Sequence, residues 1–248
     1  MKSSKKKNKS VIFPELSFEE IINDYLFCPM YYDIYDNTKF KNRYNDSYFT
    51  EQRMFETLEK IFNESNQPDF DIDSIISGIK ESYFINSGDD TSDVLNGIPE
   101  FWEKYGKFYT KLENVDMGIP GAYILNNCDL YGKIDLIIKE DDETISIVKF
   151  ISSDAKIKSY INYYEFLLSF YGFIANDIKG LGRFKIKNII SHSIKENNVY
   201  TVPFNKNNEE TIAKDLISIV DNIINENYEK YERCDLCPYN GIIICKNK

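Results

Sequence analysis

The stretch that most constrains how this chain can fold runs over residues 130–153, and it reads LYGKIDLIIKEDDETISIVKFISS. Two apolar runs rich in β-branched residues, 130–139 and 144–151, flank a short acidic turn at Asp141 and Asp142. Apolar runs of this length separated by a turn are typical of a β-hairpin. We therefore expect two antiparallel strands at the centre of the fold.

Helical and strand-like segments lie on both sides of this hairpin. Apolar periodicity and capping residues predict helices over residues 17–28, 50–62, 99–112, 159–175 and 209–231. Two further strands are predicted over residues 185–193 and 198–204. Strands flanked by helices indicate an α/β domain with a mixed central β-sheet. Residues 65–98 mix polar residues with short apolar clusters, and we interpret them as an insertion with one or two short helices.

Length and charge restrict the possible organisation of the chain. The 248 residues fit one domain over 14–248, preceded by a basic segment, 1–13, that we expect to be a disordered tail. A net charge of −10 argues against a surface that coats DNA uniformly, so any DNA site must be local. No apolar run approaches the roughly 20 residues of a membrane span, and no signal peptide is evident. We expect a cytoplasmic protein that does not associate with membranes.

The cysteines are more informative by their placement than by their number. Cys28 precedes a proline near the N-terminus, and Cys234, Cys237 and Cys245 cluster near the C-terminus, the first two in the sequence CDLCPY. A Cys-x-x-Cys pair brings two thiolates within reach of one metal centre, and four thiolates suit a [4Fe-4S] cluster or a structural zinc. Cys128 stands apart, and we interpret it as a small buried residue.

These motifs together resemble the RecB-like branch of the PD-(D/E)XK nuclease superfamily, which includes AddB-type subunits and the iron-sulfur exonucleases of CRISPR adaptation. The resemblance is carried by GKID in the hairpin, by CP after the first predicted helix, and by CDLCPY near the end. It implies a restriction-endonuclease-like core whose N- and C-terminal helices are joined by a four-cysteine cluster. It favours iron-sulfur at Cys28, Cys234, Cys237 and Cys245, with zinc as the alternative.

The same resemblance implies where a catalytic site would lie. In that branch a His, the Asp of Gly-x-x-Asp, an acid-x-Lys pair and a Gln-x-x-x-Tyr helix surround a Mg²⁺ or Mn²⁺ ion that activates water. These positions fall, in order, on Phe55, Asp135, Lys149 with Ile151, and Leu167 with Tyr171. A hard dication needs several oxygen ligands, which this set does not supply. We expect no intact catalytic set, with Asp135, Lys149 and Tyr171 as its remnants.

Three functions remain open on these grounds. The first is a catalytically degenerate, iron-sulfur-stapled protein that binds DNA or acts as a scaffold, with a protein partner, in a DNA-processing, CRISPR or mobile-element complex. The second is an active Mg²⁺- or Mn²⁺-dependent DNA exonuclease in which Glu143 or Glu165 is the relocated ligand. The third is an acidic protein-interaction module or inhibitor that does not bind DNA. His192, the single histidine, fits no family motif, and we interpret it as a structural or surface residue.

Overall fold

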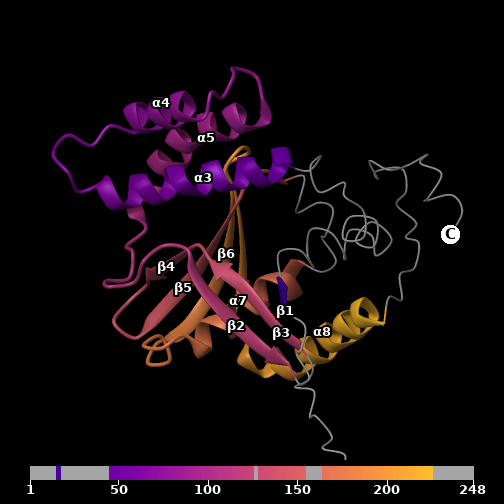
Figure 1. Ribbon diagram of the computed structural model, residues 1–248. Helices are drawn as coiled ribbons and strands as arrows, with labels where there is room; N and C mark the ends of the chain where they lie inside the picture. The colour runs from indigo at the N-terminus through magenta and orange to yellow at the C-terminus, as the bar shows by residue number, and fades with distance from the viewer. Residues whose placement is uncertain (1–14, 18–44, 126–127, 155–163, 226–248) are drawn as a thin grey trace, which may run out of the picture.

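The computed structural model describes residues 15–17, 45–125, 128–154 and 164–225 (Figure 1). Its strands are β1 (Glu15–Ser17), β2 (Ile119–Leu125), β3 (Cys128–Ile134), β4 (Leu136–Lys139), β5 (Thr144–Ile151), β6 (Lys185–Ser193) and β7 (Asn198–Pro203). Its helices are α3 (Asn45–Glu64), α4 (Ile72–Ser82), α5 (Asp90–Lys104), α7 (Tyr164–Asp177) and α8 (Glu209–Ile224), with short 3-10 turns η3 (Gly106–Phe108) and η4 (Lys206–Asn208). The chain is thus an α/β protein, as predicted.

The described strands form two sheets. The larger has the order β4-β5-β6-β7, with β5 and β6 parallel and the other pairs antiparallel, so it is a mixed sheet. The smaller has the order β1-β3-β2. The predicted hairpin is confirmed by the β4–β5 pair, in which Leu136 lies opposite Val148 and Lys139 lies opposite Ile145.

The prediction of one unbroken strand over residues 130–139 is wrong. The run divides at Asp135 into β3, which belongs to the smaller sheet, and β4, which belongs to the larger. The side chain of Asp135 accepts a hydrogen bond from the backbone N–H of Phe150 at 2.8 Å. The Asp135 carboxylate therefore accepts the Phe150 N–H, which would bond to a backbone carbonyl if the strand pairing continued through this point.

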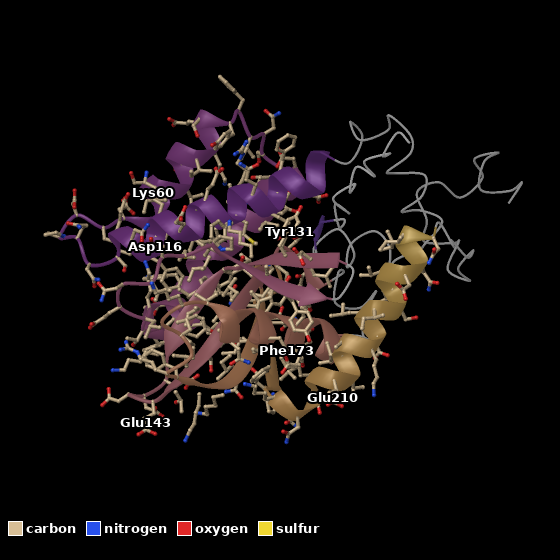
Figure 2. All side chains as sticks on the ribbon, turned by 60° about the horizontal axis from the view of Figure 1, so that its bottom comes forward. Lys60, Asp116, Tyr131, Glu143, Phe173 and Glu210 are labelled. Atoms are coloured by element: carbon tan, nitrogen blue, oxygen red, sulfur yellow. The ribbon has the colours of Figure 1, made fainter. Side chains whose placement is uncertain are left out.

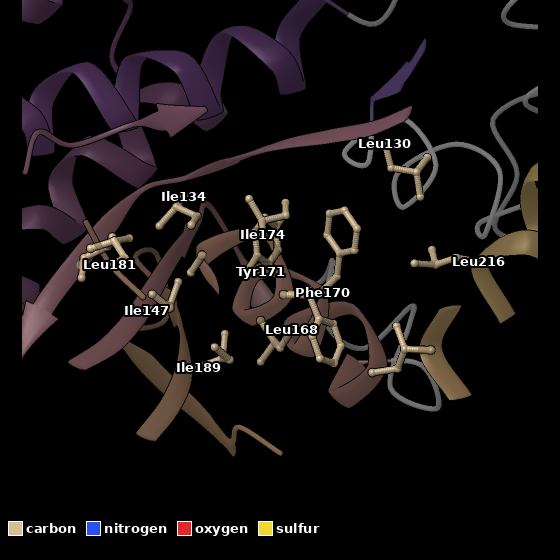
Figure 3. Packing of buried hydrophobic residues seen from close by; sticks show 14 of the residues in the cluster. Leu130, Ile134, Ile147, Leu168, Phe170, Tyr171, Ile174, Leu181, Ile189 and Leu216 are labelled. Atoms are coloured by element: carbon tan, nitrogen blue, oxygen red, sulfur yellow. The ribbon is translucent and has the colours of Figure 1, made fainter. Parts of the chain in front are cut away.

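Helices cover both faces of the larger sheet (Figure 1). Successive side chains of a strand point to opposite faces, and the two hydrophobic clusters follow this alternation. Ile137, Ile147 and Ile189 pack with residues of α7 and α8, as Figure 3 shows for part of that cluster. Leu136 and Val148 pack with α3, α4 and α5 in the second cluster. Burial on both faces explains why these strands read as continuous apolar runs.

The predicted helices differ from the observed ones mainly at their ends. The helix predicted over 99–112 begins earlier, at Asp90, because the carboxylate of Asp89 accepts the Ser92 N–H at 2.7 Å and caps it. Pro99 lies inside this helix and does not start it. The strands predicted over 185–193 and 198–204 agree with β6 and β7. Strand β2 was not predicted.

Several predictions concern residues outside the described ranges. These are the tail over 1–13, the helix over 17–28 beyond Ser17, the first residues of the helix over 159–175, the end of the helix over 209–231, and the four cysteines of the expected cluster. The segment 65–98 contains α4 and the beginning of α5. None of the helices within the described residues is long and apolar enough to cross a membrane.

Candidate functional site

The site is built around the buried carboxylate of Asp135, which is 4% exposed. One of its oxygens accepts the N–H of Phe150 at 2.8 Å, and the other lies 3.1 Å from the ammonium of Lys149. Burial raises the pKa of Asp135, and the charge of Lys149 together with the Phe150 N–H opposes that rise. Both carboxylate oxygens are thus engaged with groups of the chain itself.

Lys149 lies on the central strand β5, directly beside the break between β3 and β4. Its ammonium also donates to the carbonyl of Lys133 at 3.3 Å and lies 5.3 Å from the ring centroid of Tyr171 on α7. Its side chain is 18% exposed, so this cation is largely removed from water. The sequence-predicted remnants are therefore brought together: Asp135 from the break between β3 and β4, Lys149 from β5 and Tyr171 from α7.

A second cation and an aromatic ring lie on the α3 side of the same region. The ammonium of Lys133 is 3.4 Å from the ring centroid of Phe55, the residue at the implied His position. Gly118 lies beside this pair, and a Cβ there would meet the Lys133 side chain and the Phe55 ring. The position that the resemblance assigns to a histidine thus carries an apolar ring that contacts a lysine.

An acidic residue that the sequence analysis missed anchors the end of β5. Glu51, one helical turn before Phe55 on α3, accepts hydrogen bonds from the N–H and the hydroxyl of Ser152 at 3.2 and 2.7 Å. Ser152 lies about 100 residues from Glu51 in sequence, so no local sequence pattern predicts this contact. These bonds join α3 to the strand that carries Lys149.

The two acids considered as relocated ligands differ in placement. Glu143 lies in the turn between β4 and β5, at the end of the hairpin opposite Asp135, and Figure 2 shows it far from Tyr131 on β3. Six residues of strand separate Glu143 from Lys149, roughly 20 Å at 3.3 Å per residue. Glu165 lies in the first turn of α7, where only the backbone is described, as it also is for Leu167.

The residues present do not fit a divalent cation. Mg²⁺ and Mn²⁺ need several oxygen ligands, whereas among the described side chains a lysine ammonium lies against the Asp135 carboxylate. Across the described ranges, no group of three or more His, Cys, Asp or Glu side chains is arranged to hold a metal ion. Among the described side chains, the arrangement neutralises the Asp135 carboxylate and joins β5 to the break between β3 and β4.

His192 lies outside this site and is fully buried on β6. Its ring packs edge to face against Phe101 and Tyr105 at centroid distances of 4.7 Å, and its Nδ1 lies 3.3 Å from the hydroxyl of Tyr109. Burial lowers the pKa of His192 to about 4, so the imidazole is neutral at pH 7. The structural interpretation of His192 is confirmed.

Comparisons with known proteins bear on the fold. No protein-family model matches the chain, and a search of curated proteins gives no match. Among solved structures, the chain is similar to a protein of Eubacterium rectale described as a "putative exonuclease", with a TM-score of 0.53 and 11% identity over 91% of this chain and 86% of that one. A protein named SSO0001 matches at a TM-score of 0.37, with 12% identity over 77% of this chain and 83% of that one, too low for any argument.

The first similarity, at this low identity, shows a shared fold. Together with the mixed sheet covered by helices on both faces, it defines the class as an α/β protein that shares its fold with that neighbour.

Proposed function

We propose that this chain is a catalytically inactive nuclease-fold protein that binds DNA or acts as a scaffold in a DNA-processing complex. The observation that carries the proposal is the Asp135–Lys149 ion pair, 3.1 Å between charged atoms, at the point where a metal-dependent nuclease would collect carboxylates. Lys149 supplies the positive charge that a divalent cation would otherwise supply. A lysine ammonium neutralises a carboxylate but cannot bind and acidify a water molecule.

The DNA-binding part rests on the surface beside this pair. Tyr131 and Lys133 are exposed and lie two residues apart on β3, hence on one face of the strand. An exposed aromatic ring next to a lysine suits a nucleic acid strand, because bases stack on the ring and phosphates pair with the ammonium. In a chain with a net charge of −10 such a site is local, and its binding must weaken as salt screens it.

The test is fluorescence anisotropy with a labelled single strand and a duplex of the same sequence over a series of salt concentrations. Lys133→Glu is expected to weaken binding about tenfold and to flatten the salt dependence. Lys60→Glu, at an exposed position near the end of α3, makes the same change of charge and is the matched control. Equal binding by both variants contradicts a DNA site at this face.

The scaffold part includes the cysteine cluster. The supporting pattern is Cys28 before a proline, with Cys234, Cys237 and Cys245 near the end. We propose a [4Fe-4S] cluster that joins the two ends of the domain. Protein purified without oxygen should contain about four irons per chain. Zinc in place of iron would contradict the iron-sulfur assignment, and the absence of both would contradict the staple itself.

The acidic interaction module is the second candidate, and the net charge favours it. Measurable DNA binding that falls with salt supports the first function, whereas no binding even at low salt supports the interaction module.

A further inference from the structure

The loop between α7 and β6 carries cations without an acidic partner. Residues 178–187 read IKGLGRFKIK, with four basic residues and no Asp or Glu. Lys179 and Arg183 are exposed, and neither forms an ion pair with any other residue that the structure describes. The guanidinium carbon of Arg183 lies 4.7 Å from the ring centroid of Phe84's distant counterpart in this loop, Phe184. In a chain with a net charge of −10, cations left unpaired by the chain's own acids favour an anionic partner from outside.

A buried residue holds this loop in place. Leu181 is 4% exposed and packs in the same hydrophobic cluster as Ile134 and Ile174 (Figure 3). The N–H of Leu181 bonds to the carbonyl of Ile178 at 3.1 Å, and the carbonyl of Leu181 accepts the N–H of Phe184 at 2.9 Å. Two exposed cations, one on each side of Leu181, are thus presented from an anchored turn, which reduces the entropy lost on binding.

Two glycines leave the backbone of the loop open between these cations. Gly180 has φ of 93°, a left-handed conformation that glycine adopts without strain, and no other part of the chain lies within 4 Å of where its Cβ would be. At Gly182 the nearest such atom is the Asn176 carbonyl oxygen, at 3.9 Å. The N–H groups of both glycines form no hydrogen bond with other described residues. Open backbone N–H groups beside a lysine and an arginine are donors that suit a phosphate group.

The loop begins next to strand β2. The Cδ1 atom of Ile178 lies 3.6 Å from the position that a Cβ on Gly121 would occupy. Gly121 is paired with Gly132 of β3. The end of α7 therefore lies beneath the smaller sheet at the level of Gly132, which separates the two residues of the DNA site proposed above.

Uncharged residues lie between that site and the loop. Pro120 and Ala122 of β2 are the partners of Lys133 and Tyr131, and both are exposed. Strand β2 contains no acidic residue, and it lies at the edge of the sheet order β1-β3-β2. A nucleic acid strand bound at Tyr131 and Lys133 can thus cross β2 to the loop without meeting a carboxylate of β2 on the way.

We propose that Lys179, Gly180, Gly182 and Arg183 form a phosphate-binding loop for the backbone of a single nucleic acid strand. The proposal rests on DNA binding at the β3 site, which it extends past β2. A nucleic acid is favoured over an acidic peptide because the strand offers bases for Tyr131 as well as phosphates for the loop.

The other two basic residues of this segment are not part of the proposed loop, because they lie beside the acidic β4–β5 turn. Lys187 forms an ion pair with Glu140 at 3.6 Å, and the N–H of Lys185 bonds to the carbonyl of Glu143 at 2.8 Å.

The test is fluorescence anisotropy of the full chain with a labelled single strand over a series of salt concentrations. Lys179→Gln with Arg183→Gln should weaken binding about tenfold or more at low salt, and should lower the slope of log K against log salt by about 1.4, at about 0.7 for each phosphate contact. Lys60→Gln with Lys214→Gln removes the same charge from exposed positions on α3 and α8 and should leave the slope unchanged. Lys179→Arg with Arg183→Lys keeps both charges and should retain binding.

Lys133→Glu in the same series separates this proposal from the proposed function. If Lys133→Glu weakens binding and the Gln pair at 179 and 183 does not, the loop proposal is overturned and the β3 site stands. A loss with the Gln pair that the control pair at 60 and 214 reproduces also overturns the loop, because it reflects net charge alone. A wild-type chain that binds no strand even at low salt overturns the proposed function and the loop with it.

Discussion

The ammonium of Lys149 lies 3.1 Å from the carboxylate of Asp135, and the other oxygen of that carboxylate accepts the Phe150 N–H. The carboxylate is buried, so it depends on these two partners and not on water. The buried carboxylate therefore contributes to the fold by joining the break between β3 and β4 to β5. The same carboxylate therefore accounts for two features: it bonds to the backbone of β5 at the strand break, and it pairs with the lysine on β5.

The ion pair should show strong coupling in a double-mutant cycle. Lys149→Met removes the cation beside a buried carboxylate, and Asp135→Asn removes the charge that Lys149 faces at 3.1 Å, so each should cost about 3 kcal/mol in the free energy of unfolding. The double variant should cost clearly less than the sum, because neither charge remains. Urea denaturation at pH 7 measures all four proteins. Strictly additive losses would show that the pair contributes nothing beyond its separate residues.

Introducing the acid-x-Lys pair that the resemblance implies should create a cation site. Lys149→Glu with Ile151→Lys places a second carboxylate next to Asp135, and Ile151 shares a strand face with Lys149. Two buried carboxylates repel each other, so the double variant should melt at a lower temperature than wild type in EDTA. Mn²⁺ should raise its melting temperature, because a ligand of the native state alone stabilises it. An equal Mn²⁺ effect on wild type would show that the unaltered site already binds the ion.

His192 should make the fold sensitive to acid. Burial lowers its pKa from 6.5 to about 4, so below pH 6.5 the unfolded chain takes up a proton that the folded chain does not. The contribution of His192 is fully present above pH 6.5 and is lost as the pH falls to about 4, a loss of about 3 kcal/mol. His192→Gln cannot titrate and is the control. Urea denaturation at both pH values should show a smaller loss for this variant than for wild type.

The sequence predicts those elements of the fold that depend on neighbouring residues, and it misses those that depend on contacts with other segments. The hairpin, β6 and β7 follow from alternation and turn residues. The break at Asp135 does not, because it coincides with a side-chain hydrogen bond from the N–H of Phe150 on the paired strand, which alternation of residue types cannot indicate. Strand β2 was missed since Pro120 and Gly121 obscure its pattern, although Gly121 is needed where a Cβ would overlap Ile174.

The residues of the candidate site likewise divide into those that were predicted from the sequence and those that were not. The positions of Asp135, Lys149 and Tyr171 follow from the resemblance, and the structure brings the three together. Glu51 and Lys133 were not assigned roles, because their contacts with Ser152 and Phe55 join segments that are distant in sequence. The placement of Glu143 at the far end of the hairpin follows only once the β4–β5 register is known.

Removing the Phe84 side chain should stabilise the fold. Phe84→Gly relieves the left-handed strain at φ of 53° and removes little buried surface, because the side chain is 88% exposed. The expected gain is about 0.5–1 kcal/mol in the free energy of unfolding. Chemical denaturation measures it. A destabilised Phe84→Gly variant would show that the ring contributes to packing within the fold.

The central proposal is that this chain does not cut DNA, and a cleavage assay tests it most directly. Cluster-loaded protein is incubated with single- and double-stranded DNA in Mg²⁺ or Mn²⁺, with Asp135→Ala as the matched variant. We predict intact DNA for both proteins, because the resemblance assigns a metal ligand to the position of Lys149, and Phe55 and Ile151 cannot move a proton. Cleavage by the wild type that disappears in Asp135→Ala would contradict the account.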